Sequence, residues 1–419
     1  MRLPAPSGLW RDQKFLTFWS AQGVSEFGDR ISELALPLIA VTMLDATPFE
    51  VGLLTAAVWA PNLVSLIIGS WVDQRPDKRR LMVAADLARL VVLLSLPLAW
   101  WGGVLALWQL YAIALLTGAA KVVFDTAYAA FFVVLVRRDQ FLEANSKLSA
   151  TRSISFMAGP AIGGVMIQVL SAPLAVLADC LSFLFSAVQL WRLPLVTAAP
   201  EETTESLFQR AWGGLRYVLR HPYLRVTLAC ATTVNLFNFI GSALLVLYAS
   251  RELSLSPGTI GLAIGVGATG SLLGAMLAPR LAQRIGAGLL IAISTVIFTG
   301  AIAIVAVAGG PPWLRATELG IAEFVAGFAV MGFDVPMGAL QASVTHDAMR
   351  SRVSGAFLTI NFGVRPVGAI LGGLLGSSIG PQATLLVSAS GGVLAALWLL
   401  GSPVLATRSL EGLTPPPMD

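Results

Sequence analysis

The chain has 419 residues, of which 56% are hydrophobic and only 12% are charged. This composition is too apolar for a soluble domain and is typical of a polytopic helical membrane protein. The formal net charge of +4 is only mildly basic, and the two cysteines, Cys180 and Cys230, both fall in apolar runs. Neither a nucleic-acid surface nor a disulfide framework is therefore indicated. The polar start and long first apolar run predict no cleavable signal peptide.

The first apolar run, residues 15–44, contains ionisable residues near its middle. At about 1.5 Å per residue, a helix of this length can cross a hydrocarbon core of about 30 Å. The spacing of Glu26, Asp29, Arg30 and Glu33 places them on one stripe of that helix. Each would cost at least about 2.5 kcal/mol facing lipid at mid-membrane, so the stripe should face other helices or a wet cavity. Three acids against one arginine favour a solvated functional site over a charge-paired packing seam.

Apolar runs bounded by Gly, Pro and charge predict twelve membrane spans. They are residues 15–44, 49–72, 81–101, 107–135, 145–170, 173–193, 223–250, 257–283, 287–308, 317–344, 353–379 and 382–402. A polar segment divides them into two sets of six. We therefore expect an all-α fold with two pseudo-symmetric six-helix bundles, over 1–193 and 223–405, joined by a cytoplasmic linker over 194–222 and followed by a cytoplasmic tail over 406–419.

The two halves repeat one another at a constant offset of 209 residues. Pro48 and Gly52 recur as Pro257 and Gly261, and Phe124-Asp125 recurs as Phe333-Asp334. Further matches at this offset are Gly118 with Gly327, Gly159 with Gly368, and Gly163-Gly164 with Gly372-Gly373. Duplicated halves with a polar site near their interface are expected of a secondary transporter that works by alternating access.

Residues 69–80, between the second and third spans, form a short turn with a basic cluster. The turn resembles the loop signature of the major facilitator superfamily, Gly-x-x-x-Asp followed by basic residues. The resemblance implies a twelve-span transporter in which this loop is a cytoplasmic gate that stabilises one transport state. By position, the gate residues would be Gly69, Asp73 and Arg79 or Arg80.

Lys121 and Asp125 are one turn apart on the fourth span. Opposite charges at this spacing satisfy each other, so a structural pair is favoured over a functional one. Both residues nevertheless remain candidates for the wall of a substrate cavity.

The fifth span contains Arg152, a further candidate for the cavity wall, and then a glycine-rich stretch. Glycines permit close helix packing and a proline kinks the helix. The stretch resembles the Gly-Pro-x-x-Gly-Gly signature of antiporter branches of the superfamily. With Ala178-Asp179 and Ser182-Phe183 downstream, the chain is similar to the efflux branch that includes macrolide and multidrug exporters. The resemblance implies export, with motif residues Gly159, Pro160, Gly163 and Gly164.

The second half offers neutral amides where the first half has acids. The offset of 209 residues maps Glu26 and Asp29 onto Asn235 and Asn238, which we expect to line the substrate cavity.

Arg365 lies well inside the eleventh span and is also expected at this cavity. Asp334 repeats Asp125 without a lysine neighbour and is a candidate for proton coupling. Asp179 and Glu323 are isolated carboxylates that we expect nearer to span ends, where burial costs less.

The basic residues are distributed unevenly among the predicted loops. Twenty of the 27 Lys and Arg residues fall on the side of both termini, and only Arg251 and Arg315 fall in the opposite loops. The positive-inside rule therefore predicts a multi-pass protein of the bacterial inner membrane with both termini in the cytoplasm.

Burial favours the neutral form of a carboxylate, and a nearby arginine opposes this effect. We hypothesise that Glu26 or Asp29 binds a proton when substrate is absent and releases it when a cationic or polar substrate enters. Arg30, Glu33 and Asp334 are the other residues expected to take part in proton coupling. The predicted function is a proton-coupled exporter of hydrophobic or amphipathic compounds. Alternatives are uptake or facilitated diffusion of a polar metabolite, and a transporter-like sensor.

Residues 376–380 match the Gly-x-Ser-x-Gly pattern of a hydrolase nucleophile, but they end a predicted membrane helix. The sequence contains no Gly-x-x-x-x-Gly-Lys-Ser/Thr loop and no Cys/His cluster with metal-ligand spacing. We therefore expect no enzyme activity, cofactor or metal. The expected partners are a small-molecule substrate, protons and the lipid bilayer, without nucleic acid, and the protein is expected to be a monomer.

Overall fold

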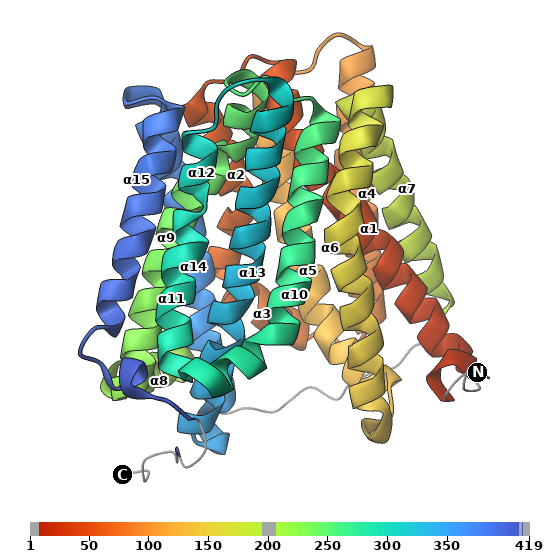
Figure 1. The fold of residues 1–419 in the computed structure, drawn as a ribbon. Coiled ribbons are helices and arrows are strands. Elements are labelled where there is room, and N and C mark those ends of the chain that lie inside the picture. Colours follow the sequence, from red (N-terminus) through yellow and green to blue (C-terminus); the bar gives the residue numbers. More distant parts are fainter. Residues whose placement is uncertain (1–7, 195–206, 410–412, 414–419) are drawn as a thin grey trace, which may run out of the picture.

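The computed structural model describes residues 8–194, 207–409 and 413. Within these ranges the chain forms helices and no β-strand, so the predicted all-α class is confirmed. Figure 1 shows long helices side by side, with α4, α6 and α7 on one side of the bundle and α9, α11 and α15 on the other.

The first half runs from η1 to α7. Its elements are η1 (Gly8–Arg11), α1 (Gln13–Thr42), α2 (Pro48–Trp59), η2 (Ala60–Val64), α3 (Ser65–Asp73), α4 (Lys78–Trp101), α5 (Leu107–Leu135), η3 (Arg138–Gln140), α6 (Phe141–Leu170) and α7 (Ala172–Arg192). The expected span 49–72 is interrupted at η2, which contains Pro61. A proline removes a backbone donor and disrupts regular helix geometry.

The second half begins after α8 (Leu207–Arg220), a helix inside the polar segment that packs on α9 and α14. Its elements are α9 (Pro222–Arg251), α10 (Pro257–Ile285), α11 (Ala287–Gly300), α12 (Ile302–Ala306), α13 (Pro312–Val344), η4 (Asp347–Met349), α14 (Arg350–Ser378), α15 (Pro381–Leu394), η5 (Ala395–Leu399) and α16 (Pro403–Ala406).

Eleven helical stretches of the described chain are long and apolar enough to cross a membrane. They coincide with the second to twelfth expected spans. Helix α1 has 30 residues, which is also long enough, but its ionisable stripe places four charged residues near its middle. A total of twelve spans therefore remains a prediction.

Corresponding helices in the two halves begin with similar caps. The side chain of Thr47 accepts from the backbone of Glu50 at the start of α2, and Ser256 accepts from the backbone of Thr259 at the start of α10. Each cap precedes a proline in the first helical turn, a position that needs no backbone donor. The repeat seen in the sequence thus reappears in local structure.

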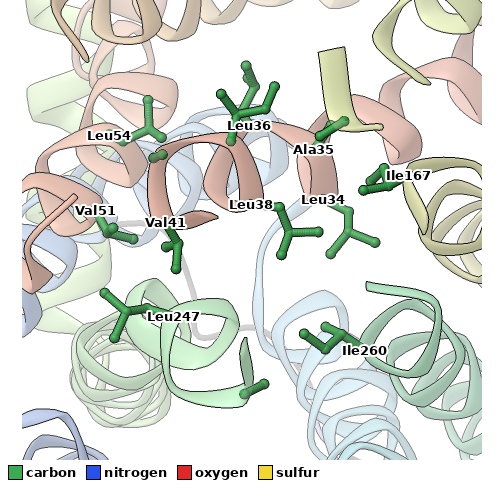
Figure 2. Close-up of a cluster of buried hydrophobic side chains, with 14 of the residues drawn as sticks. Leu34, Ala35, Leu36, Leu38, Val41, Val51, Leu54, Ile167, Leu247 and Ile260 are labelled. Atoms are coloured by element: carbon green, nitrogen blue, oxygen red, sulfur yellow. The ribbon is translucent and has the colours of Figure 1, made fainter. Parts of the chain in front are cut away.

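Among the described residues, the two halves share a hydrophobic core toward only one end of the bundle. We call the end at which α1 and α9 begin the proximal end, and the end with loops 43–47 and 252–256 the distal end. A continuous distal core contains residues of both halves. Figure 2 shows Leu34 and Leu38 of α1 facing Ile260 of α10, with Val41 facing Leu247 of α9. At the proximal end, each half has a core of its own.

Glycines bring the halves into backbone contact beside the distal core, where α2 meets α14 and α6 meets α10. A Cβ on Gly52 would lie 2.5 Å from the carbonyl oxygen of Ala369, and one on Gly164 would lie 2.5 Å from that of Pro257. No residue larger than glycine fits these two crossings without displacing a helix.

Candidate functional site

A cavity of about 540 Å³ lies between the two halves, among α1, α6, α10, α11 and α13. Its charged lining residues are Arg30, Glu33, Arg152 and Glu323. Most of the remaining wall is apolar, with Phe156, Phe298 and Met331 among the larger side chains. A largely apolar cavity with a few charged groups is the usual form of a small-molecule site.

Arg30 holds the charged part of this wall together. Its guanidinium contacts Glu33 at 2.5 Å and Glu26 at 3.7 Å, and it lies 3.9 Å from the centre of the Phe156 ring. A Cβ on Gly159 would lie 2.6 Å from the Cβ of Arg30. The glycine-rich stretch of α6 therefore lets α1 approach closely enough for Arg30 to lie against the cavity.

Arg152 extends this set of ion pairs from α6. Its Nε lies 3.5 Å from Glu26, so Glu26 is held by two arginines, Arg30 and Arg152. The side chain of Glu26 is buried, whereas Arg152 is 57% exposed. At this part of the cavity wall, the exposed Arg152 thus covers the buried Glu26.

Asp29 belongs to a second ionic cluster, deeper in the first half. Its carboxylate lies 3.3 Å from Arg89 of α4 and 3.2 Å from Lys121 of α5. Arg89 also contacts the fully buried Asp86 at 2.7 Å. The expectation of incompletely paired acids on α1 is wrong, because basic partners come from α4, α5 and α6 as well as from α1 itself.

The expected pair of Lys121 with Asp125 is present at 3.8 Å, but Lys121 lies closer to Asp29. The side chain of Asp125 is 57% exposed. Lys121 therefore joins the buried cluster to the accessible surface of α5.

Two carboxylates expected near span ends lie well inside their helices. Asp179 is fully buried in α7, and its oxygens accept hydrogen bonds from Ser32 and Ser182. Glu323 lies about three turns into α13 and lines the cavity. For Glu323 the expectation of a position near a span end is wrong because α13 begins at Pro312, about five residues before the expected start at 317. Asp179 lies about two turns into α7, which begins within one residue of the expected start.

Arg365 lies where aromatic residues of both halves meet. Its guanidinium is 4.3 Å from the ring centres of Trp59 and Phe362, and 5.1 Å from that of Phe239. Its Nε donates to the side-chain oxygen of Asn235 at 3.2 Å. Arg365 and Asn235 are thus together, but neither is among the residues that line the 540 Å³ cavity, so their expected place at the substrate site stays a prediction.

Asn238 and Asp334 lie outside this group of direct contacts. Asn238 is half-buried on α9, one turn beyond Asn235, and Asp334 is exposed on α13. The described part of the chain contains no group of three His, Cys, Asp or Glu residues that could hold a metal ion.

The family of transmembrane secretion effectors matches residues 5–414 of this sequence. The chain belongs to this family of the major facilitator superfamily. The predicted superfamily and its efflux branch are thereby confirmed, and the protein is a membrane transporter and not an enzyme.

This transporter is similar over most of its length to several bacterial proteins. It is 27% identical to the uncharacterized MFS-type transporter YfiS of Bacillus subtilis, covering 90% of this chain and 91% of that one. It is 24% identical to the enterobactin exporter EntS of Salmonella typhimurium, with coverage of 92% and 91%. It is 26% identical to the multidrug efflux pump Tap of Mycobacterium tuberculosis, with coverage of 86% and 87%.

Solved structures share the fold of this transporter. A bacterial homologue of the iron transporter ferroportin, in an inward-facing state, superimposes with a TM-score of 0.73 at 14% identity, covering 93% of this chain and 98% of that one. The nucleoside transporter NupG gives a TM-score of 0.66 at 14% identity, with coverage of 93% and 98%.

The predicted gate residues of the transporter surround the start of α4. Arg79 donates to the carbonyl oxygens of Trp191 and Leu193 at 2.9 and 2.5 Å, and Arg80 pairs with Asp77 at 2.9 Å. Neither arginine contacts Asp73 among the described residues; instead, Lys78 donates to the backbone carbonyl of Asp73 at 3.0 Å. A Cβ on Gly69 would meet only Thr126, at 3.9 Å.

The other motif glycines of α6 contact α1 and α10. A Cβ on Gly163 would lie 3.2 Å from the Cα of Ile31, and Pro160 directs its carbonyl oxygen at Gly261. Together with Gly159 and Gly164, these residues place α6 between the charged stripe of α1 and the second half. The motif thus positions the cavity wall and the contact between the halves.

Arg251, the last residue of α9, connects the halves at the distal end. It donates to the carbonyl oxygens of Ala46 and Val41, both at 2.9 Å, and lies 3.6 Å from Asp45. Charge-assisted hydrogen bonds of this kind are stronger than neutral ones.

Sequence reasoning missed Asp86 and Arg89, and the aromatic residues around Arg365. Asp86 and Arg89 are three residues apart within the third predicted span, and two ionisable residues inside an apolar run were a usable signal. The aromatic group of Trp59, Phe239 and Phe362 gave no such signal, because its members are far apart in the sequence and aromatic residues are common in membrane helices.

Proposed function

We propose that this transporter is a proton-coupled antiporter that exports hydrophobic or amphipathic small molecules by alternating access. The observation that carries the proposal is the cavity of about 540 Å³ between the halves, where charged groups interrupt an otherwise largely apolar wall. Such a wall suits a ligand with a large apolar surface and a few polar groups.

The distribution of the hydrophobic cores supports alternating access. Among the described residues, the buried apolar clusters shared by both halves lie toward the distal end, whereas each half has a core of its own at the proximal end, so the halves can rock about their distal contacts. The excess of Lys and Arg in proximal loops favours a cytoplasmic proximal end in the bacterial inner membrane. The arrangement then corresponds to a state that takes up substrate from the cytoplasm.

The functions of two relatives support export as the direction of transport. EntS is an enterobactin exporter and Tap is a multidrug efflux pump, and both align with nearly the whole chain. The likeness to NupG supports the fold alone, because the two sequences are only 14% identical.

For proton coupling, Glu33 is a better candidate than Asp29. The Glu33 side chain lines the cavity and is 52% exposed, whereas Asp29 is held between Arg89 and Lys121. Protonation of Glu33 would remove its ion pair with Arg30 and change the charge of the wall. Proton binding and substrate binding would thus act on the same surface.

The test is flux in inverted membrane vesicles, whose outer face corresponds to the cytoplasm. A vesicle interior more acidic than the medium should drive uptake of fluorescent amphipathic dyes, and a protonophore should abolish it. Glu33→Gln should reduce the gradient-driven component about tenfold. Glu318→Gln is the matched control, since Glu318 lies near the distal end and accepts a hydrogen bond from the backbone of Gly309.

Dye flux in the opposite direction would support uptake and contradict the proposal. Binding of dye without any flux would support the sensor interpretation instead. Full gradient-driven flux in Glu33→Gln would remove Glu33 from the coupling mechanism and leave export intact.

A further inference from the structure

Among the described residues, Glu323 is the one charged residue of the second half on the cavity wall. Its carboxylate forms no hydrogen bond or ion pair with the described residues, although it lies well inside α13. A carboxylate at such depth in a membrane helix is costly, and acids of this kind face a cavity or a partner. Glu323 faces the cavity, so a ligand bound there could pair with its carboxylate.

The other charged groups that face the cavity come from α1 and α6, and they already satisfy one another. Arg30 binds Glu33 and Glu26, and Arg152 binds Glu26. With Glu323, three acids stand against two arginines, so the site retains one negative charge. Since Glu26 and Glu33 both contact an arginine, that charge belongs to Glu323.

The surroundings of Glu323 match the body of an amphipathic cation. The backbone of Gly267 on α10 lies beside it, where an added Cβ would be 3.1 Å from the Cβ and carbonyl oxygen of Glu323. The side chain therefore leaves this close helix crossing toward the cavity. Phe298 of α11 and Met331, about two turns further along α13, also line the cavity and offer the aromatic and thioether groups that attract organic cations and pack on apolar rings.

We propose that Glu323 binds the positive charge of an organic monocation, whose apolar body occupies the rest of the cavity. This assignment rests on the proposed transport function and specifies its substrate class. Anionic compounds of the same size are disfavoured at Glu323 because its carboxylate repels them and Arg30 is already engaged by two acids.

Binding of two ions of nearly equal shape and opposite charge tests this assignment. Tetraphenylphosphonium and tetraphenylborate can each be titrated, as radiolabelled compounds, onto the full-length protein in detergent in a scintillation proximity assay. We expect the phosphonium to bind at least about tenfold more tightly than the borate, as one unpaired charge in a half-buried site would produce. Equal affinities, or a preference for the borate, would overturn the proposal.

Variants of Glu323 test whether this residue causes the preference for the phosphonium over the borate. Glu323→Gln should weaken phosphonium binding about tenfold and remove the discrimination between the two ions. Glu323→Asp, which retains the negative charge, should keep most of the discrimination between the two ions. Glu318→Gln makes the same chemical change on α13 outside the cavity and should bind as the wild type does.

Thermal unfolding in the same detergent shows whether each variant is folded, and a folded Glu323→Gln protein with unchanged phosphonium affinity would refute the assignment. Dye flux in vesicles separates this outcome from failure of the proposed function. Gradient-driven export by a protein without charge preference would reject the role of Glu323 alone. Absence of flux in the wild type, with charge-selective binding intact, would reject transport alone.

Discussion

Lys121 of α5 places its Nζ 3.2 Å from the Oδ2 of Asp29 on α1, nearer than its distance of 3.8 Å to Asp125 on its own helix. The contact links two helices whose residues are 92 positions apart in the sequence. Through Arg89, the same carboxylate is connected to α4. Asp29 is therefore a junction between three helices of the first half.

Replacement of Asp29 should primarily destabilise the protein. Asp29→Asn leaves Arg89, which is 2% exposed, with a single acidic partner, and removal of one member of a buried pair costs about 3 kcal/mol or more. We expect a clear fall in the thermal unfolding temperature in detergent. Asp125→Asn is the control and should have a small effect because Asp125 is largely exposed. An unchanged unfolding temperature for Asp29→Asn would contradict the structural role.

Replacement of Arg251 should favour opening at the distal end. Arg251→Gln weakens two charge-assisted hydrogen bonds to the first half, and a loss of about 2 kcal/mol would shift the equilibrium about 30-fold. Spin labels at Trp101→Cys and Val307→Cys, both on exposed distal positions, should show longer distances. Arg280→Gln is the control, since Arg280 bonds only within its own helix among the described residues. If the Arg251→Gln and Arg280→Gln variants gave identical distance distributions, the hydrogen bonds of Arg251 would not be what holds the distal end closed.

A methyl group at the contact of α6 with α10 should disturb transport. Gly164→Ala places a Cβ 2.5 Å from the carbonyl oxygen of Pro257, so the helices must separate. We expect dye export in vesicles to fall at least about fivefold, with about 1–3 kcal/mol lost in stability. Gly355→Ala should behave as the wild type because an added Cβ there would meet no described atom of another helix within 4 Å. Equal export by both variants would show that the crossing tolerates expansion.

Acidification should weaken the junction of α8 with α9 through His221. His221 is buried between Tyr217 and Tyr223, and burial lowers its pKa below the ordinary value of 6.5. Below pH 6.5 the unfolded chain therefore binds a proton that the folded protein resists, so this contribution to stability is lost as pH falls. Thermal unfolding between pH 8 and 5 should show a smaller loss for His221→Gln than for the wild type. A steeper loss for the variant would show that the imidazole is stabilised in its charged form.

Much of the fold could be predicted because it depends on local patterns. Apolar runs locate the eleven helical stretches that are long and apolar enough to cross a membrane, and the repeat of Pro48 and Gly52 as Pro257 and Gly261 corresponds to similar helix starts. The polar composition of residues 194–222 hid helix α8, whose apolar face packs on α9 and α14. Its residues alternate between polar and apolar at helical spacing, which average composition does not reveal.

The candidate site could be predicted only in part. Spacing on one helix identified the pairing of Arg30 with Glu26 and Glu33, since these residues are neighbours on α1. The partners of Asp29 were beyond such reasoning because they lie on α4 and α5. Glu323 was noticed as an isolated acid, but its place on the cavity wall depends on the packing of α10 against α13.

Because the shared hydrophobic core lies at the distal end, a small tilt of the two halves produces a larger displacement at the proximal end. Helices of about 30 residues extend about 45 Å, so their proximal ends lie roughly 30 Å from the distal contacts. A tilt of about 10° around those contacts moves the proximal ends by about 5 Å, which exceeds the separation of about 3.5–4.0 Å between carbon atoms in contact. A small tilt at the glycine contacts between the halves would therefore open the proximal end wide enough for a flat molecule to enter.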